Sequence, residues 1–141
     1  MNKKILFVNC SVYLPGEHAL KRTMYLFEMM HDKNLNVEFL TSDFNHYTKK
    51  MRDILKFREM YPEYNTGIGF IHVPEYDNNI SVRRFYSNYL FEKRAMKYIR
   101  EHIDEYGAVY LSLPVIYMGG PLSKLWVQFV RTRRFVAYSY F

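Results

Sequence analysis

The stretch Lys3–Ser42, KKILFVNCSVYLPGEHALKRTMYLFEMMHDKNLNVEFLTS, predicts a strand, a loop, a helix and a second strand. Ile5–Val8 is a short continuous apolar run, which is typical of a strand buried on both faces of a parallel sheet. Apolar residues recur at helical spacing within Leu20–Met30, and Val37–Thr41 is the next apolar run. Ligands of open α/β sheets bind at the carboxyl ends of the strands, so function is expected first in the loop that begins at Asn9.

The same alternation continues along the rest of the chain. Further strands are expected at Ile68–Val73, Ala108–Leu113 and Phe135–Tyr138, and further helices at Tyr47–Met60, Val82–Ile103 and Leu122–Val130. This order predicts an α/β fold, a Rossmann-like parallel sheet of about five strands in the order 3-2-1-4-5 with helices on both faces. A chain of 141 residues is expected to form a single domain, residues 1–141.

Composition excludes several classes of protein. No stretch of about 18 consecutive apolar residues occurs, so no transmembrane helix is expected. Only four strongly apolar residues separate Lys4 from Asn9, which does not fit a signal peptide, so a cytoplasmic location is expected. The single cysteine, Cys10, excludes an internal disulfide. No dinucleotide fingerprint, phosphate-binding Walker loop or zinc-ligand spacing is present, so no cofactor and no metal site are predicted.

The net charge of +6 is concentrated in the helix expected at Val82–Ile103. Such a cluster suggests phosphate, nucleic acid or anionic lipid as a partner, and a solvated helix face is the alternative. The aromatic residues Phe85, Tyr86 and Tyr89 follow the predicted apolar stripe, with the basic residues on the opposite face. Aromatic residues buried in a core cannot stack on nucleobases, so nucleic acid is disfavoured as the partner. The basic residues predicted to form a membrane or anion surface are Arg83, Arg84, Lys93, Arg94, Lys97 and Arg100.

The loop after the first strand carries the best candidate site. Glu17 and His18 come just before the helix, and Lys21 and Arg22 follow about one turn later. Free backbone amides at the start of a helix, together with these bases, could hold a phosphate or a sugar. The equally weighted alternative is that Glu17 complements the helix dipole while the bases are solvated.

Several segments together resemble the N-terminal half of family 4 glycosyltransferases with the GT-B fold, most closely the bacterial capsule and O-antigen enzymes. The resemblance rests on Lys4–Val8, Tyr13–Glu17, Lys21–Thr23, Val37–Phe44, Val73–Tyr76, Asn79–Arg84 and Val109–Pro114. It implies the acceptor-binding domain of a retaining glycosyltransferase that uses a nucleotide-sugar. The donor domain with its Glu-x7-Glu motif is absent from this chain, so the isolated chain is expected to be inactive. The pair His18-Ala19 departs from the small, often Gly-Gly, pair of the family.

The resemblance and the sheet-edge rule together predict an acceptor site. Lys21 and Arg22 would meet a diphosphate, and Glu17 and Asp43 would accept hydrogen bonds from sugar hydroxyls. The expected partners are a lipid-linked or other sugar acceptor and an anionic membrane surface, with no nucleic acid. The predicted site residues are Tyr13, Pro15, Gly16, Glu17, His18, Lys21, Arg22, Ser42, Asp43, Ser112 and Pro114.

Two further expectations concern an exposed apolar surface and the alternative functions of the chain. Trp126, Phe129 and Phe135–Phe141 are expected to form an exposed apolar surface that favours self-association, because a partner domain is missing. The alternative functions are a non-enzymatic Rossmann-like binding module, and a membrane-surface or nucleic-acid binder that acts through the basic helix.

Overall fold

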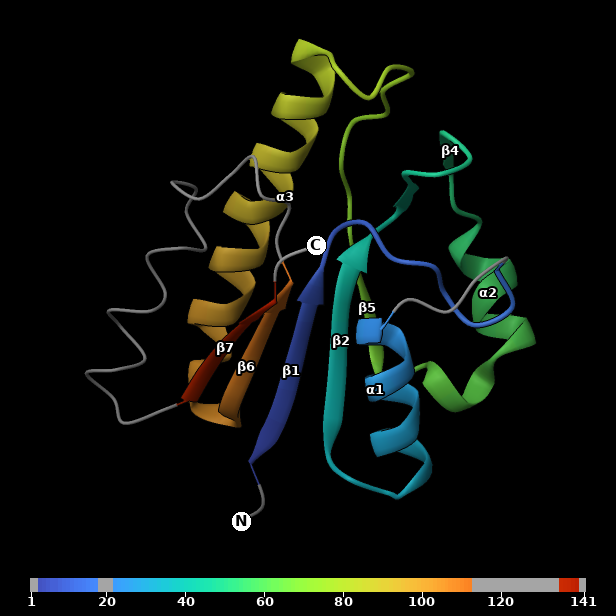
Figure 1. Cartoon of the computed structure of the whole chain (residues 1–141). Helices are drawn as coiled ribbons and strands as arrows, with labels where there is room; N and C mark the ends of the chain where they lie inside the picture. The colour runs from blue at the N-terminus through green and yellow to red at the C-terminus, as the bar shows by residue number, and fades with distance from the viewer. Residues whose placement is uncertain (1–2, 18–21, 113–134, 140–141) are drawn as a thin grey trace.

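The computed structural model of the protein describes residues 3–17, 22–112 and, for the backbone alone, 135–139. Its centre is a five-stranded sheet in which all neighbouring strands are parallel, in the order β5-β2-β1-β6-β7 (Figure 1). Counted within this sheet, the strands therefore lie in the order third, second, first, fourth and fifth. The predicted α/β class is confirmed. The strands are β1 Lys4–Asn9, β2 Val37–Ser42, β5 Ile68–Ile71, β6 Tyr106–Ser112 and β7 Phe135–Ser139.

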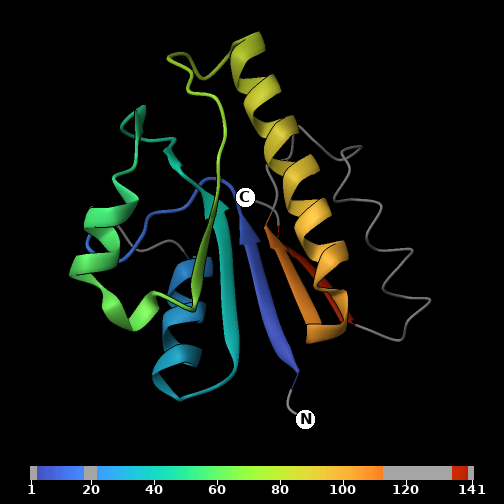
Figure 2. The same cartoon turned by 180° about the vertical axis from the view of Figure 1, so that it is seen from behind.

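Helices cover both faces of the sheet, as predicted (Figures 1 and 2). The helix α1, Arg22–Asp32, packs Met24 and Phe27 against Phe7 of β1 and Phe39 of β2. The helix α3, Val82–Glu101, lies on the opposite face and packs against a second core. Successive strand residues point to opposite faces, so the apolar run of β1 supplies both cores. The second core contains Leu6, Val8, Leu40, Phe91, Ala95, Met96 and Ile99.

The helix predicted at Tyr47–Met60 is wrong in its first half. A two-stranded antiparallel hairpin, β3 Phe44–Asn45 and β4 Lys50–Met51, precedes the shorter helix α2, Ile54–Met60. The Asn45 side-chain oxygen accepts hydrogen bonds from the backbone amides of Tyr47 (2.9 Å) and Thr48 (3.2 Å). This local turn forms in place of the predicted start of the helix, because asparagine readily makes hydrogen bonds to the backbone of the residues that follow it.

The predicted apolar stripe of α3 is also wrong in its first half. Val82, Tyr86 and Tyr89 are 83%, 55% and 47% exposed, whereas the buried apolar residues of α3 begin at Phe91. The amino-terminal half of the helix extends beyond the carboxyl edge of the sheet, so no strand lies beneath it (Figure 1). Ser81 caps the helix, since its side-chain oxygen accepts a hydrogen bond from the Arg84 amide (3.2 Å).

Some strand boundaries differ from the predicted ones, and some predictions concern residues outside the described part of the chain. The third strand of the sheet ends at Ile71 rather than Val73, and the fourth is β6, Tyr106–Ser112, rather than Ala108–Leu113. A short helix, η1 Pro62–Tyr64, follows α2, and η2, Ile103–Glu105, follows α3. The helix predicted at Leu122–Val130 and the apolar surface predicted around Trp126 lie outside the described residues, as do the side chains of β7.

Candidate functional site

Three small polar residues form a row across the carboxyl ends of neighbouring strands. Asn9 ends β1 and pairs with Ser112 at the end of β6, and Thr41 of β2 lies one residue beyond the Val8–Leu40 pair. Asn9, Thr41 and Ser112 are all fully buried. Because side chains alternate along a strand, they share the face of the sheet that α1 covers.

The row has unsatisfied hydrogen-bonding groups. Within the described part of the chain, Asn9 Nδ2, Thr41 Oγ1 and Ser112 Oγ have no hydrogen-bond partner. The other side-chain atom of Asn9, its Oδ1, accepts from the Ser11 amide (3.0 Å). A buried polar group without a partner costs about 1–3 kcal/mol, so three in one row are costly to folding. The row lies where the strand order reverses, between β1 and β6, which is where open α/β sheets bind ligands.

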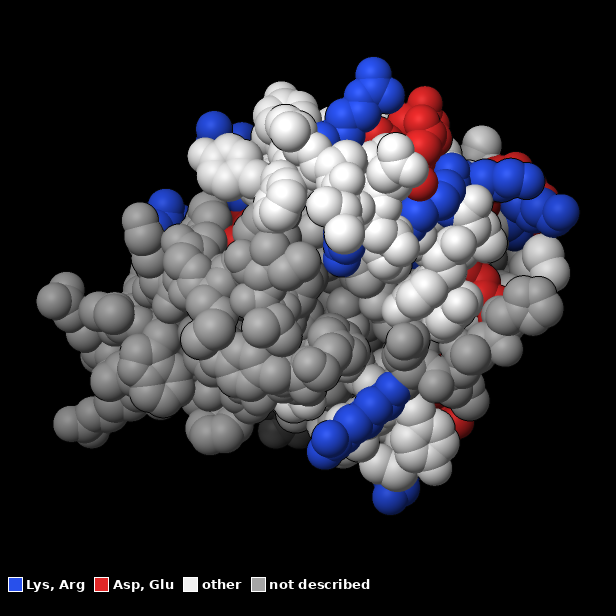
Figure 3. All heavy atoms as spheres, turned by 45° about the horizontal axis from the view of Figure 1, so that its top comes forward, with Lys and Arg blue, Asp and Glu red and all other residues white. Residues whose placement is uncertain are grey.

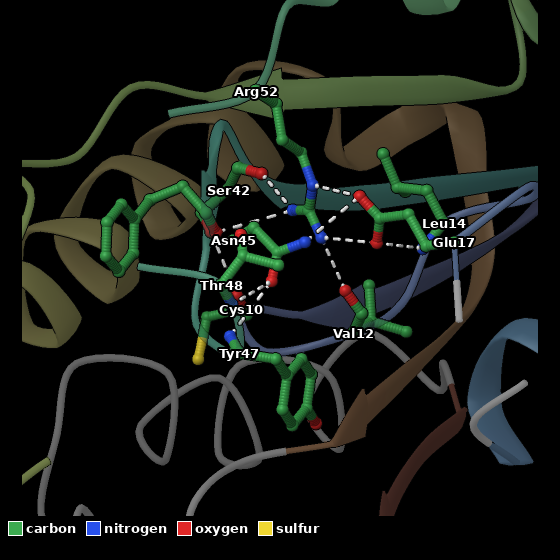
Figure 4. Close-up of polar contacts among 10 residues, drawn as sticks. Cys10, Val12, Leu14, Glu17, Ser42, Asn45, Tyr47, Thr48 and Arg52 are labelled. Carbon is green, nitrogen blue, oxygen red and sulfur yellow. Dashed lines mark hydrogen bonds and ion pairs between the residues drawn. The ribbon is translucent and has the colours of Figure 1, made fainter. Parts of the chain in front are cut away.

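Glu17 is held by an arginine that the sequence analysis did not single out (Figure 4). Arg52 Nε lies 3.1 Å from Glu17 Oε1, and one terminal guanidinium nitrogen, Nη2, lies 3.2 Å from Glu17 Oε2. Asn45 Nδ2 and the Leu14 amide also donate to the carboxylate, at 3.2 and 2.8 Å. The remaining donors of Arg52 reach the carbonyl oxygens of Val12 (2.6 Å) and Ser42 (2.8 Å).

This network, the Glu17–Arg52 tie, joins the loop after β1 to the β3–β4 hairpin. Both oxygens of Glu17 already accept two hydrogen bonds each, so the predicted direct contact of Glu17 with sugar hydroxyls meets a carboxylate that is engaged in structure. A pocket of about 240 Å³ lies beside the tie, lined in part by Leu14, Lys50 and Phe57. Glu17 therefore shapes the rim of a pocket instead of standing free within it.

The rest of the loop after β1 is closely packed. Gly16 has a φ of 83°, and a Cβ atom there would lie 1.9 Å from the Tyr61 hydroxyl, so only glycine fits. The ring of Tyr13 stacks on Tyr47 with centroids 4.0 Å apart. Pro15 is buried. These contacts fix the loop through Glu17 against both the hairpin and the segment after α2.

Asp43 and Ser42 lie at the carboxyl end of β2, as predicted, but neither is free to meet a ligand. Asp43 Oδ1 accepts from the Val73 amide (3.0 Å), and Asp43 Oδ2 accepts from His72 Nδ1 (2.6 Å). The Ser42 hydroxyl is buried and lies 2.9 Å from the Cys10 carbonyl oxygen. The His72 ring, in contrast, is exposed to solvent at this end of the sheet, and the sequence alone suggests a surface or boundary histidine there and not a ligand-binding one.

The structure brings together part of the predicted site. Tyr13, Glu17, Ser42, Asp43 and Ser112 all lie at the carboxyl edge of the sheet, on or directly after its strands. Arg22 is the first residue of α1 and is exposed, and the amino end of α1 faces the same edge (Figure 1). His18, Lys21 and Pro114 lie outside the described residues.

The predicted basic surface of α3 is exposed, but it shares its face with aromatic residues. Steps of three and four residues place Val82, Tyr86, Tyr89, Lys93, Lys97 and Arg100 in one row along the helix, and all six are exposed. We call this row the outer α3 face. The other three basic residues of the predicted surface lie outside this row. Arg83 is exposed beside the row, Arg84 donates to the Asn79 carbonyl (2.6 Å), and Arg94 donates to the His72 carbonyl.

The described part of the chain gives two further results. None of its helices has the length and hydropathy needed to cross a bilayer. It also holds no group of three or more His, Cys, Asp or Glu side chains placed to bind a metal ion.

Comparison with known proteins adds no assignment. No protein-family model matches the chain, and no curated protein has a significant sequence match to it.

Proposed function

We propose that this chain is the acceptor-binding domain of a retaining glycosyltransferase that transfers a sugar from a nucleotide-sugar during capsular polysaccharide or O-antigen synthesis. The observation that carries the proposal is the buried polar row of Asn9, Thr41 and Ser112 at the reversal point of the sheet. The family resemblance of the sequence supplies the donor class and the retention of configuration. Transfer itself also requires a donor-binding domain, and the proposal assigns only acceptor binding to residues 1–141.

The polar row and α1 suit a phosphorylated sugar. One amide and two hydroxyl groups have unused donors, which a phosphate or sugar oxygen reaches once the residues that bury them move aside. The amino end of α1 faces this edge, and Arg22 lies at its start, so the local field favours an anion (Figure 1). A lipid-linked acceptor carries both groups, a sugar and a diphosphate.

The first test is binding of a soluble acceptor analogue, farnesyl-diphospho-N-acetylglucosamine, followed by amide chemical shifts of the full chain. We expect shifts at Asn9, Ser112 and the loop Tyr13–Glu17, because these groups line the carboxyl edge. Thr41→Val removes one unsatisfied hydroxyl without changing the side-chain volume, and should weaken binding about fivefold. Thr66→Val is the matched control, since Thr66 is exposed between η1 and β5. An absence of shifts at the carboxyl edge contradicts the proposal.

The outer α3 face supports a membrane-bound acceptor. Its first half is apolar and aromatic, and its second half carries Lys93, Lys97 and Arg100. A helix that exposes aromatic residues beside bases suits the interface of an anionic bilayer. The proposal therefore places the domain on the cytoplasmic face of the cell membrane, with this helix in contact with the lipid.

The second test measures binding to phosphatidylcholine vesicles with and without phosphatidylglycerol. We expect binding only with the anionic lipid, and Lys93→Gln should weaken it about fivefold, the effect of one charge near the surface. Tyr86→Ser should also weaken it by removing a ring from the interface. Lys56→Gln, at an exposed lysine of α2, is the control and should leave binding unchanged.

A parallel binding measurement with single-stranded RNA addresses the nucleic-acid alternative. Tyr86 and Tyr89 are exposed on the face that carries Lys93, so the predicted separation of aromatic and basic residues onto opposite faces of this helix is wrong. Proteins bind single-stranded nucleic acids without sequence preference when nucleobases stack on exposed aromatic rings that lie beside basic side chains. Salt-sensitive binding to single-stranded RNA, with no affinity for either vesicle, would favour that alternative over the membrane.

A further inference from the structure

The side chain of His72 is held in one orientation by a buried carboxylate. Asp43 is 7% exposed, and its Oδ2 accepts from His72 Nδ1 at 2.6 Å. The second oxygen of Asp43 accepts from the Val73 amide, and Arg94 donates to the His72 carbonyl, so the backbone on each side of the ring is also tethered. The ring itself is 73% exposed.

This geometry fixes what His72 offers to a ligand. A carboxylate can only accept a hydrogen bond, so Nδ1 of the neutral ring carries the proton and Nε2 is left as an acceptor. Nε2 has the lone pair that a hydroxyl donor needs. An imidazole that is oriented by a carboxylate and exposed on its other side is preorganised for such a contact, since little rotational freedom is lost on binding.

A groove of about 590 Å³ lies at this position, between the hairpin, the loop after β5 and the amino end of α3. Its lining includes His72, Glu75, Arg83, Tyr86 and Met51. Figure 3, which brings the carboxyl edge of the sheet forward, shows basic and acidic side chains intermixed around uncharged surface. Hydroxyl groups require both acceptors and donors, and the apolar face of a sugar ring packs on an aromatic ring, so this lining matches a saccharide.

The groove also adjoins the outer α3 face, because Tyr86 belongs to both. A ligand anchored in the bilayer would therefore present its head group within reach of the groove while the helix contacts lipid. Arg83 also lines the groove, and an arginine suits the phosphate that links such a head group to its lipid.

We propose that this groove binds the saccharide head group of a membrane-anchored acceptor, with His72 Nε2 accepting a hydrogen bond from a sugar hydroxyl and Asp43 acting as its positioning residue. The inference rests on the proposed function and adds a second binding position, about the loop after β5, to the polar row at the reversal point.

The test compares farnesyl-diphospho-N-acetylglucosamine with farnesyl diphosphate, which lacks the sugar, on the full chain with ¹⁵N-labelled histidine. In the free protein, long-range ¹H–¹⁵N spectra should show His72 protonated at Nδ1. The sugar-bearing probe should shift Nε2, and farnesyl diphosphate should not. His72→Ala should weaken the sugar-bearing probe roughly fivefold, the effect of one hydrogen bond, and leave farnesyl diphosphate unchanged.

Two further variants separate positioning from folding. Asp43→Asn should remove the preference for the Nδ1 tautomer and weaken the sugar-bearing probe as His72→Ala does. His102→Ala, at a half-buried histidine at the far end of α3, is the control and should change neither affinity. Because Asp43 is buried and its replacement can disturb folding, the exposed His72 variant decides the matter.

The outcomes distinguish this inference from the function on which it rests. Unchanged affinity of His72→Ala for the sugar-bearing probe, with shifts confined to Asn9, Ser112 and Tyr13–Glu17, overturns the groove and leaves the acceptor site standing. Failure of both probes to shift any residue of the carboxyl edge overturns both proposals.

Discussion

Replacing Arg52 by methionine is expected to lower the free energy of unfolding by about 3 kcal/mol, the lower end of the cost of breaking a buried ion pair. The Arg52 side chain is 6% exposed and satisfies a carboxylate and two carbonyl oxygens that lie within 3.2 Å. Methionine keeps much of the side-chain volume but offers no donor. Glu17 would be left half-buried without its counter-charge, and the carbonyls of Val12 and Ser42 would lose their shared partner.

Urea unfolding of four proteins measures this effect: the parent chain, Arg52→Met, Glu17→Gln and the double variant. The double variant should be less destabilised than the sum of the single variants, because each single change already removes the charge pair. Arg58→Met is the matched control, since Arg58 donates to the carbonyls of Tyr64 (3.3 Å) and Asn65 (2.8 Å) from the surface of α2. Equal losses for Arg52→Met and Arg58→Met would show that the carboxylate contributes nothing.

The protein is expected to unfold at alkaline pH. Burial raises the pKa of the Cys10 thiol from 9.0 to about 11 and that of the Tyr64 hydroxyl from 10.0 to about 12. Burial also raises the pKa of Tyr106, which is fully buried and hydrogen-bonded to Tyr98. The cause is shared: the charged form of each group is poorly solvated inside the fold.

The direction of the effect follows from proton counts. Between the unfolded and folded pKa of each group, the unfolded chain has lost a proton that the folded chain still holds. The free energy of unfolding therefore falls as pH rises, from about 9.0 to 11 for Cys10 and from about 10.0 to 12 for Tyr64. Because folded domains are only marginally stable, the ionisation of both groups is expected to be enough to promote unfolding.

Chemical denaturation at a series of pH values between neutral pH and about 12 checks this prediction, with Tyr64→Phe as the informative variant. The phenylalanine cannot ionise, so the variant should lose less stability than the parent chain above pH 10.0. Tyr25→Phe is the control, since the Tyr25 ring is exposed on α1 and should leave the alkaline limb unchanged. A parent chain whose stability is flat across this range would contradict the buried, neutral state of these groups.

The sequence predicted the central sheet well because its signals are local and redundant. Each long apolar run bounded by loops became a strand, and parallel pairing follows from the helices between the runs. The two failures have different causes, neither of which a pattern of apolar residues can register. At Asn45 a side-chain turn replaced the start of a helix. The amino-terminal half of α3 extends beyond the sheet (Figure 1), and Tyr86 of that half is exposed.

The position of the candidate site in the fold could be predicted from the sequence, but several of its residues could not. Strand ends at the carboxyl edge were foreseen, so Asp43 and Ser112 lie where expected. Arg52 gave no signal, because its partner Glu17 is 35 residues away in sequence and was expected to face a ligand. His72 was interpreted from the sequence as a surface or boundary histidine near a strand end, because its partner Asp43 is 29 residues away in sequence. The strand ends at Ile71, which brings His72 to the edge.

The Glu17–Arg52 tie decides when the loop after β1, the proposed binding loop, becomes ordered. Its hydrogen bonds hold Val12, Leu14 and Glu17 in place in the folded protein before any ligand arrives. The entropy of ordering that loop is therefore lost during folding, and the affinity for a ligand is not reduced by it. Association at this edge should consequently proceed as an encounter between rigid partners, limited by diffusion and orientation and not by closure of the loop.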